Sequence, residues 1–268
     1  MNYLKYRKDT FTTTGNDGLI EKIFNTINIK QGTFIEFGAW DGIKRANCRK
    51  LFLEGWDGLF IESNFLRYLK LFWNYRNQKK IQTLYAKVDC EGKQSLDYLV
   101  EKAGIEKVDF ISIDVDGLDF AIFEKIEKLS PILFCIEGGQ MLEPYHPKLP
   151  REIEKKNIQQ SLNILKIIAE KKGYKILCSF QDTFLIRKDY THFFEINDNI
   201  ERLYIDGLIS SYNRLPWIQR VLKLVNLKNE IIDTILHQTK YKQYGYEKRK
   251  IWAEENSDDI IKTIKKII

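Results

Sequence analysis

Five short apolar runs, each ending at or next to an acidic residue, constrain the fold of this chain most strongly. They are rich in β-branched and aromatic residues and lie at residues 33–37, 58–61, 83–88, 109–113 and 132–136. Such runs are typical of strands buried on both faces of a parallel sheet. Two further runs, 175–180 and 183–187, are separated only by Gln181 and Asp182, which is too short for a crossover. We therefore expect an α/β fold with a seven-stranded, mostly parallel sheet, an antiparallel terminal hairpin and helices on both faces.

Helical patterns occupy the intervals and the last third of the chain. Gly173 is a suitable C-cap for a helix whose apolar positions are Ile158, Leu162, Leu165 and Ile168. We expect residues 1–190 to form one domain and residues 191–268 a helical extension. Apolar residues at helical spacing in the extension fill Trp217–Gln238, and a second helix is expected to open at Ser257 and to carry Ile260, Ile261, Ile264, Ile267 and Ile268. That stripe has to be buried on the core domain or on a second subunit, so the extension either caps a substrate or makes a homodimer.

Composition and charge exclude several classes of protein. The net charge is +6, with a mildly basic C-terminal third, which falls far short of the basic footprint of a nucleic-acid-binding protein. The N-terminus has no apolar leader, and no 18-residue apolar run is present, so we expect no membrane span. The cysteines are spread without a metal-binding spacing, which predicts reduced thiols in a cytoplasmic protein and no structural zinc: Cys48, Cys90, Cys135 and Cys178.

Acidic residues at the strand ends predict a ligand-binding cleft. In an open α/β sheet, ligands bind at the carboxyl ends of the strands. The first run leads into the turn Glu36–Gly42, where Gly38 permits a tight bend and Gly42 lets the next helix start near the strand. Glu62 ends the second run and is placed to accept hydrogen bonds from a ribose, while Asp89 follows the third on the adenine side. The alternative is that these acids only cap the following helices.

Two cofactor classes compete for this cleft. A dinucleotide requires G-x-G-x-x-G, in which backbone amides and a helix N-terminus hold a pyrophosphate. Here Trp40 replaces the second glycine, and Glu36 and Asp41 would repel phosphate. S-adenosylmethionine carries a sulfonium and an ammonium and no phosphate. Electrostatics therefore favour S-adenosylmethionine over NAD.

Several segments together resemble the FkbM-type group of class I S-adenosylmethionine-dependent methyltransferases. They are TGNDGLIEKIF, TFIEFGAWDG, GWDGLFIES, SLDYL, VDFISIDVDGLDF and the closing helix and hairpin, and they cover residues 16–189. The resemblance implies a Rossmann-like domain that binds S-adenosylmethionine and releases S-adenosylhomocysteine. It also implies a set of cofactor contacts: Glu36, Gly38, Ala39 and Asp41 at the methionine part, Glu62 at the ribose and Asp89 at the adenine side. Trp40 departs from the E-x-G-x-G-x-G form of the wider superfamily, and we count it, Ser63 and Asp114 among the cofactor-binding residues as well.

The acceptor is expected to be a hydroxyl group. The fourth run is followed by Asp114-Val115-Asp116-Gly117 and not by an N-P-P-Y-like motif, which disfavours methylation of base amino groups. Members of the resembling group commonly methylate hydroxyls of sugars or small metabolites in surface-glycan or secondary-metabolite biosynthesis. We expect O-methylation of a small molecule or sugar, either free or nucleotide-activated, and no nucleic-acid partner.

Methyl transfer to a weakly nucleophilic hydroxyl benefits from a general base. His146, in the loop after the fifth run, is the first candidate, against the alternative of a surface-loop histidine between two prolines. Asp116 and Glu137 are the other candidates. Asp114, Asp116 and Glu137 would also suit Mg²⁺, although we expect no metal here and assign these residues to the pocket and its loops. An NAD-linked oxidoreductase and a non-catalytic methyltransferase-like assembly module are the alternative functions.

Overall fold

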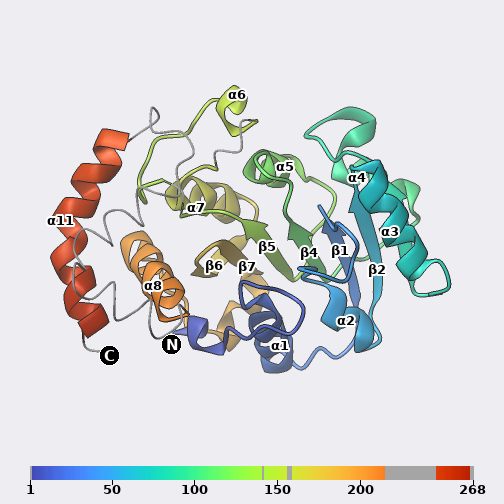
Figure 1. Ribbon diagram of the computed structural model, residues 1–268, viewed down its shortest axis with the longest axis horizontal. Helices are drawn as coiled ribbons and strands as arrows, with labels where there is room; N and C mark the ends of the chain where they lie inside the picture. Colours follow the sequence, from blue (N-terminus) through green and yellow to red (C-terminus); the bar gives the residue numbers. More distant parts are fainter. Residues whose placement is uncertain (1, 141, 156–158, 215–245, 266–268) are drawn as a thin grey trace.

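The structure is a computed structural model that describes residues 2–140, 142–155, 159–214 and 246–265 (Figure 1). Its sheet has the strand order β3-β2-β1-β4-β5-β7-β6, in which the first five strands run parallel and β7 is antiparallel to β5 and β6. The strands are β1 Thr33–Phe37, β2 Asp57–Glu62, β3 Ile81–Tyr85, β4 Phe110–Ile113, β5 Leu133–Glu137, β6 Tyr174–Ser179 and β7 Asp182–Arg187. This confirms the predicted fold class, a Rossmann-like mixed sheet with a terminal hairpin.

Helices cover both faces of the sheet. On one face, α1 Asn16–Thr26, α2 Arg49–Leu53 and α3 Phe65–Tyr75 share a buried cluster with the strands. On the other face lie α4 Leu96–Lys102, α5 Asp119–Lys125, α7 Leu162–Lys171, α8 Ile200–Asn213 and part of α11 Tyr246–Lys265. The short α6 Arg151–Glu154 and three 3-10 turns, Tyr3–Tyr6, Gly92–Gln94 and Lys188–Phe193, complete the described elements.

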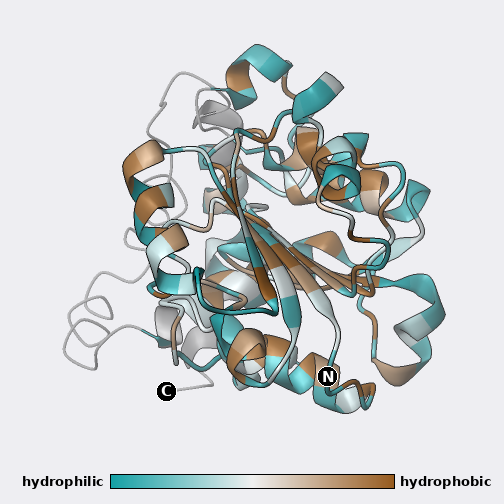
Figure 2. Ribbon diagram, turned by 90° about the vertical axis from the view of Figure 1, so that its right-hand side faces the viewer, coloured by the Kyte–Doolittle hydropathy of each residue, from teal (hydrophilic) through white to brown (hydrophobic). Residues whose placement is uncertain are grey.

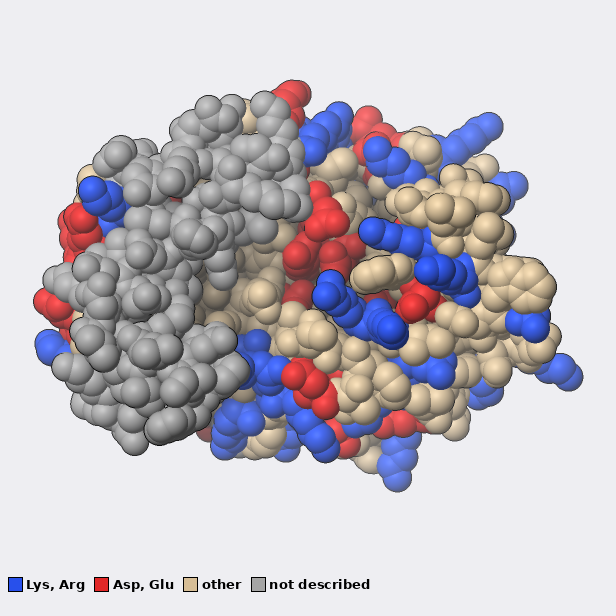
Figure 3. Space-filling view, in the orientation of Figure 1, with Lys and Arg blue, Asp and Glu red and all other residues tan. Residues whose placement is uncertain are grey.

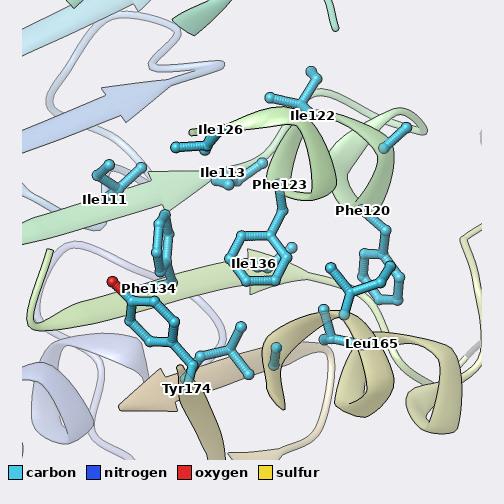
Figure 4. Close-up of a cluster of buried hydrophobic side chains, with 14 of the residues drawn as sticks. Ile111, Ile113, Phe120, Ile122, Phe123, Ile126, Phe134, Ile136, Leu165 and Tyr174 are labelled. Carbon is cyan, nitrogen blue, oxygen red and sulfur yellow. The ribbon is translucent and has the colours of Figure 1, made fainter. Parts of the chain in front are cut away.

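The core is apolar on both sides of the sheet, as the uninterrupted apolar runs predict (Figure 2). Successive strand residues point to opposite faces, so Phe34 packs with α1 and Ile35 with the helices of the other layer. Figure 4 shows the second layer, where Phe123 of α5 meets Phe134 of β5 edge-on with ring centroids 4.9 Å apart. Tyr174 closes this cluster and donates its hydroxyl to Pro131 O at 2.6 Å, which satisfies its polar end.

The terminal hairpin and the helix before it agree with the sequence pattern. Only Phe180 and Gln181 separate β6 from β7, so the two strands have to be antiparallel. Gly173 follows α7 with a φ of 83°, the left-handed conformation that ends helices and that glycine adopts without strain. Of the predicted apolar positions of this helix, Ile158 lies outside the described residues.

The C-terminal part differs from the prediction at Ser257. This residue lies within α11 and does not open it; its side chain is buried and Oγ donates to Glu254 O at 2.9 Å. A serine that bonds back to the preceding turn is tolerated inside a helix. Helix α11 begins at Tyr246, well before Ser257. This earlier part of the helix contains Trp252, which is buried, with its ring centroid 5.0 Å from that of Tyr204 in α8.

The other C-terminal predictions are tested only in part. Ile261 is partly buried against the core. The segment Trp217–Gln238 and the ends of the isoleucine stripe, Ile267 and Ile268, lie outside the described residues, as do the side chains of Ile260 and Ile264. The four cysteines are free thiols, and all are buried. In the described part of the chain, no helix is long and apolar enough to cross a membrane.

Candidate functional site

A cleft of about 640 Å³ opens at the carboxyl ends of β1, β2, β4 and β5. We call it the strand-end cleft. Its floor is acidic, with Glu62, Asp89, Asp114, Asp116 and Glu137. Its rim is basic, with Lys44, Arg45, Arg67, Lys87 and Lys155. Figure 3 shows acidic side chains gathered at the centre of this face, with basic ones beside them.

The loop after β1 turns at Gly38. Its φ is 78°, and a Cβ atom at this position would lie 1.6 Å from the carbonyl oxygen of Asp114. No side chain fits in that space, so glycine allows the loop to approach the end of β4. The backbone N–H groups of Gly38 and Ala39 both donate to Ile61 O, at 3.1 and 3.2 Å, and tie the loop to β2.

Trp40 has the backbone conformation of a glycine. Its φ is 52°, in the left-handed region, which costs a non-glycine residue about 1–3 kcal/mol. The ring is partly exposed and lies between two guanidinium groups, with the Cζ atoms of Arg45 and Arg67 at 5.7 and 5.0 Å from its centroid. The turn therefore keeps the backbone shape of the glycine-rich form while placing an aromatic ring at the mouth of the cleft.

Glu62 joins this loop to the end of β2. Its Oε2 accepts the N–H of Trp40 at 2.8 Å, and its Oε1 accepts the N–H of Asn64 at 2.7 Å. The residue is only 3% exposed, yet it lines the cleft, next to Ser63. A carboxylate has about four acceptor sites, so two hydrogen bonds leave capacity for ligand hydroxyls.

Two of the predicted contact residues do not line the cleft. Glu36 is buried and accepts the backbone N–H groups of Asn47 at 2.9 Å and Cys48 at 2.8 Å. Burial raises the pKa of Glu36 to about 7, although these two hydrogen bonds oppose the shift. Asp41 Oδ1 accepts the N–H groups of Ile43 and Lys44, both at 2.9 Å. Both carboxylates hold the loop from within because its backbone donors have no helix or strand partner.

Gly42 has a different role from the predicted one. Its φ is 70°, and a Cβ atom there would lie 2.5 Å from the ring of Tyr75 and 2.7 Å from Leu71, both in α3. The next helix, α2, begins only at Arg49. Gly42 therefore lets the loop pack against α3 and does not bring α2 close to β1.

Three carboxylates meet on the floor of the cleft. One oxygen from each of Asp114, Asp116 and Glu137 lies within 4.8 Å of the others. Desolvation in the cleft raises the pKa of Asp114 and of Glu137, and neighbouring carboxylates raise it further, although Asp114 is exposed to the open cleft and Glu137 is half-buried. Such a group can hold a proton, a cationic part of a ligand or a divalent cation. Glu137 Oε2 is buried and makes no hydrogen bond within the described part of the chain.

Asp119 supports this floor from the first position of α5. Its carboxylate accepts the N–H of Val115 at 2.8 Å and of Gly117 at 2.9 Å, which fixes the loop that carries Asp116. Asp116 itself has a φ of 58°, so the backbone of this loop is constrained. Asp119 thus lies in the opening turn of α5, where a negative charge is favourable.

Asp89 lines the cleft, although the third strand ends earlier than predicted. β3 stops at Tyr85, because its pairing with β2 ends at Glu62, and only an isolated bridge to Ser95 follows at Asp89. Asp89 Oδ1 accepts the N–H of Cys90 at 2.7 Å, so the residue is oriented by its own turn.

His146 does not line the cleft. It is 7% exposed, and its Nδ1 lies 2.7 Å from Glu143 Oε1, while its carbonyl oxygen accepts Ser161 Oγ at 2.7 Å. None of the described residues 138–150, in the loop after β5, lines the cleft. The arrangement is that of a buried structural pair, so the structure does not bring His146 to Asp116 and Glu137.

Sequence reasoning missed the basic rim. Its five members come from two loops, from α3 and from the end of α6, so no local motif unites them. One signal was present: residues 64–88 contain six Lys or Arg and no Asp or Glu. That segment supplies Arg67 and Lys87.

A scan against protein-family models finds no match for this chain, and a search of curated proteins finds no relative. Several solved structures similar to the chain are described as methyltransferases. A candidate tRNA (m1A22) methyltransferase from Streptococcus pneumoniae is 13% identical, with a TM-score of 0.47, over 90% of this chain and 97% of that one. TrmK from M. capricolum, in complex with S-adenosyl-homocysteine, is 15% identical, with a TM-score of 0.44, over 91% and 96%.

A SAM-dependent methyltransferase from Aquifex aeolicus is 14% identical, with a TM-score of 0.38, over 62% of this chain and 86% of that one. Of these three descriptions, only that of the Streptococcus pneumoniae protein names a methyl acceptor, a tRNA. The narrower resemblance to the FkbM-type group stays a prediction.

Proposed function

We propose that the strand-end cleft binds S-adenosylmethionine and that the protein is a methyltransferase. The observation that carries this proposal is the turn after β1, bent by Gly38 and held by Glu62 over an acidic floor. The backbone of Gly38, Ala39 and Trp40 would flank the methionine part. Glu62 and Ser63 would meet the ribose hydroxyls and Asp89 the adenine side, with Asp114 facing the ammonium group.

The same turn disfavours a dinucleotide. Pyrophosphate sites use a helix N-terminus directly behind the glycine turn. Here α2 begins at Arg49, well after the end of β1 at Phe37, and it spans only five residues. The acidic floor would also repel a pyrophosphate, whereas it complements a sulfonium and an ammonium. The residues present therefore fit S-adenosylmethionine better than NAD.

Methyl transfer to a hydroxyl requires the protein to align the acceptor and to remove its proton. Bound S-adenosylmethionine supplies a methyl group on a positively charged sulfur, ready for in-line displacement. The cleft has to hold the acceptor hydroxyl in line with that bond, since alignment supplies much of the rate. A carboxylate has to accept the hydroxyl proton, and we assign this role to Asp116 or Glu137. A cationic ligand beside Glu137, whose pKa is raised by desolvation and by neighbouring carboxylates, would favour its ionised, proton-accepting form.

For the acceptor, we propose a hydroxyl of a sugar or related metabolite that carries phosphate. S-adenosylmethionine has one carboxylate, which needs about one of the five cations that line the cleft. None of these five forms an ion pair with a described acidic residue, and all are exposed. The surplus lies at the rim, apart from the acidic floor, and there it suits the phosphates of a nucleotide-activated sugar.

The test is transfer of labelled methyl groups from S-adenosylmethionine to a panel of nucleotide-activated sugars, free sugars and RNA. We expect labelling of the phosphate-bearing sugars, with Glu137→Gln or Asp116→Asn reducing turnover at least tenfold and leaving S-adenosylhomocysteine bound. Repeating the assay with a chelator shows whether turnover requires a divalent cation held by Asp114, Asp116 and Glu137. Labelling of RNA alone would overturn the acceptor assignment, and labelling of nothing would overturn the assignment of the activity.

A further inference from the structure

Helix α3 carries apolar residues on two faces, and only one of them is used in the core. Leu71 and Tyr75 point inward and are fully buried. Phe65, Leu66, Phe72 and Trp73 are exposed by 54, 70, 41 and 59%. Positions i, i+1, i+7 and i+8 lie on one side of a helix, so these four side chains form a continuous outer stripe.

The stripe extends onto the edge of the sheet. Tyr85 of β3, the edge strand, is 51% exposed, and its ring centroid lies 5.6 Å from that of Phe65. We call Phe65, Leu66, Phe72, Trp73 and Tyr85 the α3 patch. Large apolar side chains exposed singly are ordinary on protein surfaces, but a contiguous group of five marks a site of interaction.

The surroundings of the α3 patch are strongly basic. Within the stretch 64–88, all six charged residues are basic and all are exposed: Arg67, Lys70, Arg76, Lys79, Lys80 and Lys87. Their sum equals the net charge of the entire chain, +6. At the right of Figure 3, over α3, the surface is largely uncharged and bordered by Lys and Arg.

Three kinds of partner can be compared with these features. A second copy of the chain, related by two-fold symmetry, would place the same basic surface against itself, which like-charge repulsion opposes. A single-stranded nucleic acid would use the aromatic rings for stacking, but a base gains little from Leu66 or from a stripe that runs along the helix. An amphipathic surface with aromatic and aliphatic side chains amid Lys and Arg matches the interfacial layer of an anionic bilayer.

We infer that the α3 patch docks on the surface of an anionic phospholipid membrane. The aromatic and leucine side chains enter the boundary between headgroups and acyl chains, and the surrounding cations contact the lipid phosphates. Arg67 lies both beside the α3 patch and in the lining of the strand-end cleft. Docking therefore brings the mouth of the cleft next to the membrane. The inference rests on the surface of α3 and does not depend on the proposed activity.

The test is co-sedimentation of the full chain with vesicles of phosphatidylcholine, with and without an equal part of phosphatidylglycerol. We expect binding to the anionic vesicles only. Phe72→Ser with Trp73→Ser should weaken it at least tenfold, because two large side chains leave the interface. The matched control, Ile167→Ser with Ile251→Ser, removes two exposed side chains from α7 and α11 and should bind like the parent protein.

Charge and fluorescence give independent readouts. Lys70→Glu with Lys79→Glu should weaken binding more than tenfold, whereas the equal charge change Lys8→Glu with Lys171→Glu should have a small effect. The blue shift of tryptophan emission on vesicle binding should decrease in Trp73→Phe while sedimentation persists. Absence of binding to anionic vesicles overturns the inference, as does equal binding by the Phe72/Trp73 variant. A concentration-dependent dimer that this variant abolishes, without vesicle binding, would assign the patch to a second copy instead.

Discussion

The Oε2 atom of Glu62 accepts a hydrogen bond of 2.8 Å from the backbone N–H of Trp40, so the end of β2 holds the turn that follows β1. Trp40 lies in the loop after β1 and Glu62 ends the neighbouring strand β2, and both residues line the strand-end cleft. One carboxylate thus shapes the loop and lines the cleft. A change at Glu62 should therefore affect both the turn and any ligand that the cleft binds.

Replacing Glu62 with alanine should lower affinity for S-adenosylhomocysteine at least tenfold. The free energy of unfolding should fall by only about 1–3 kcal/mol, because two backbone donors lose a partner while the sheet stays intact. Calorimetric titration and urea unfolding measure the two effects. Glu152→Ala, an exposed glutamate in α6, is the control and should change neither. Unchanged affinity in Glu62→Ala would remove Glu62 from the binding site.

Gly38→Ala should lower the free energy of unfolding far more than Gly92→Ala. Both glycines have positive φ, 78° and 68°, so both substitutions pay about 1–2 kcal/mol of backbone strain. Only at Gly38 does the new Cβ collide with backbone, 1.6 Å from Asp114 O, whereas nothing lies within 4 Å at Gly92. We expect a loss of more than about 3 kcal/mol for Gly38→Ala in urea unfolding. Similar losses at the two sites would show that the close approach is relieved by movement of the loop.

His146→Ala should retain methyl transfer and lose stability. The histidine pairs with buried Glu143 and lies outside the cleft lining, so its removal leaves a buried carboxylate without its partner, at a cost of about 1–3 kcal/mol. Thermal unfolding and turnover are measured on the same preparation. Loss of turnover with an unchanged melting temperature would restore His146 as the base.

Glu36 should make stability depend on pH between about 4.5 and 7. Its pKa is raised by burial from 4.5 to about 7 in the folded protein, so the folded state binds the proton more tightly than the unfolded state. The stability linked to that proton is present in full below pH 4.5 and is lost as pH rises through 7, by roughly 3 kcal/mol.

The variant Glu36→Gln isolates this effect because the amide does not titrate. It costs stability at every pH, since its NH₂ group faces one of the backbone donors of Asn47 and Cys48. The difference in unfolding free energy between parent and variant should therefore shrink from pH 5 to about pH 8. A constant difference across this range would show that Glu36 is ionised throughout.

The sheet was predictable because its strands are continuous apolar runs, and burial on both faces leaves no other assignment for them. Gly38, Glu62 and Asp114 were found for the same reason: parallel strands carry their last residues to one edge. Pattern alone set the end of β3 too late, since Val88 continues the apolar run after pairing with β2 has ended at Tyr85.

The predictions that were wrong or incomplete concern residues whose positions depend on packing between distant parts of the chain. Glu36 sits at a strand end like Glu62, and only the course of residues 38–48 shows that backbone amides occupy its carboxylate. His146 follows β5 by nine residues, a distance that leaves its position to the packing of the loop. The basic rim of the cleft assembles from distant segments, so its members look like ordinary surface charges in the sequence.

The most direct measurement of the central claim is calorimetric titration of the protein with S-adenosylhomocysteine, with NAD as the comparison and a repeat in chelator. We expect a single site with a Kd in the micromolar range, or about −8 kcal/mol, for S-adenosylhomocysteine, and no binding of NAD. Absence of S-adenosylhomocysteine binding, both with added divalent cation and with chelator, would contradict the central claim.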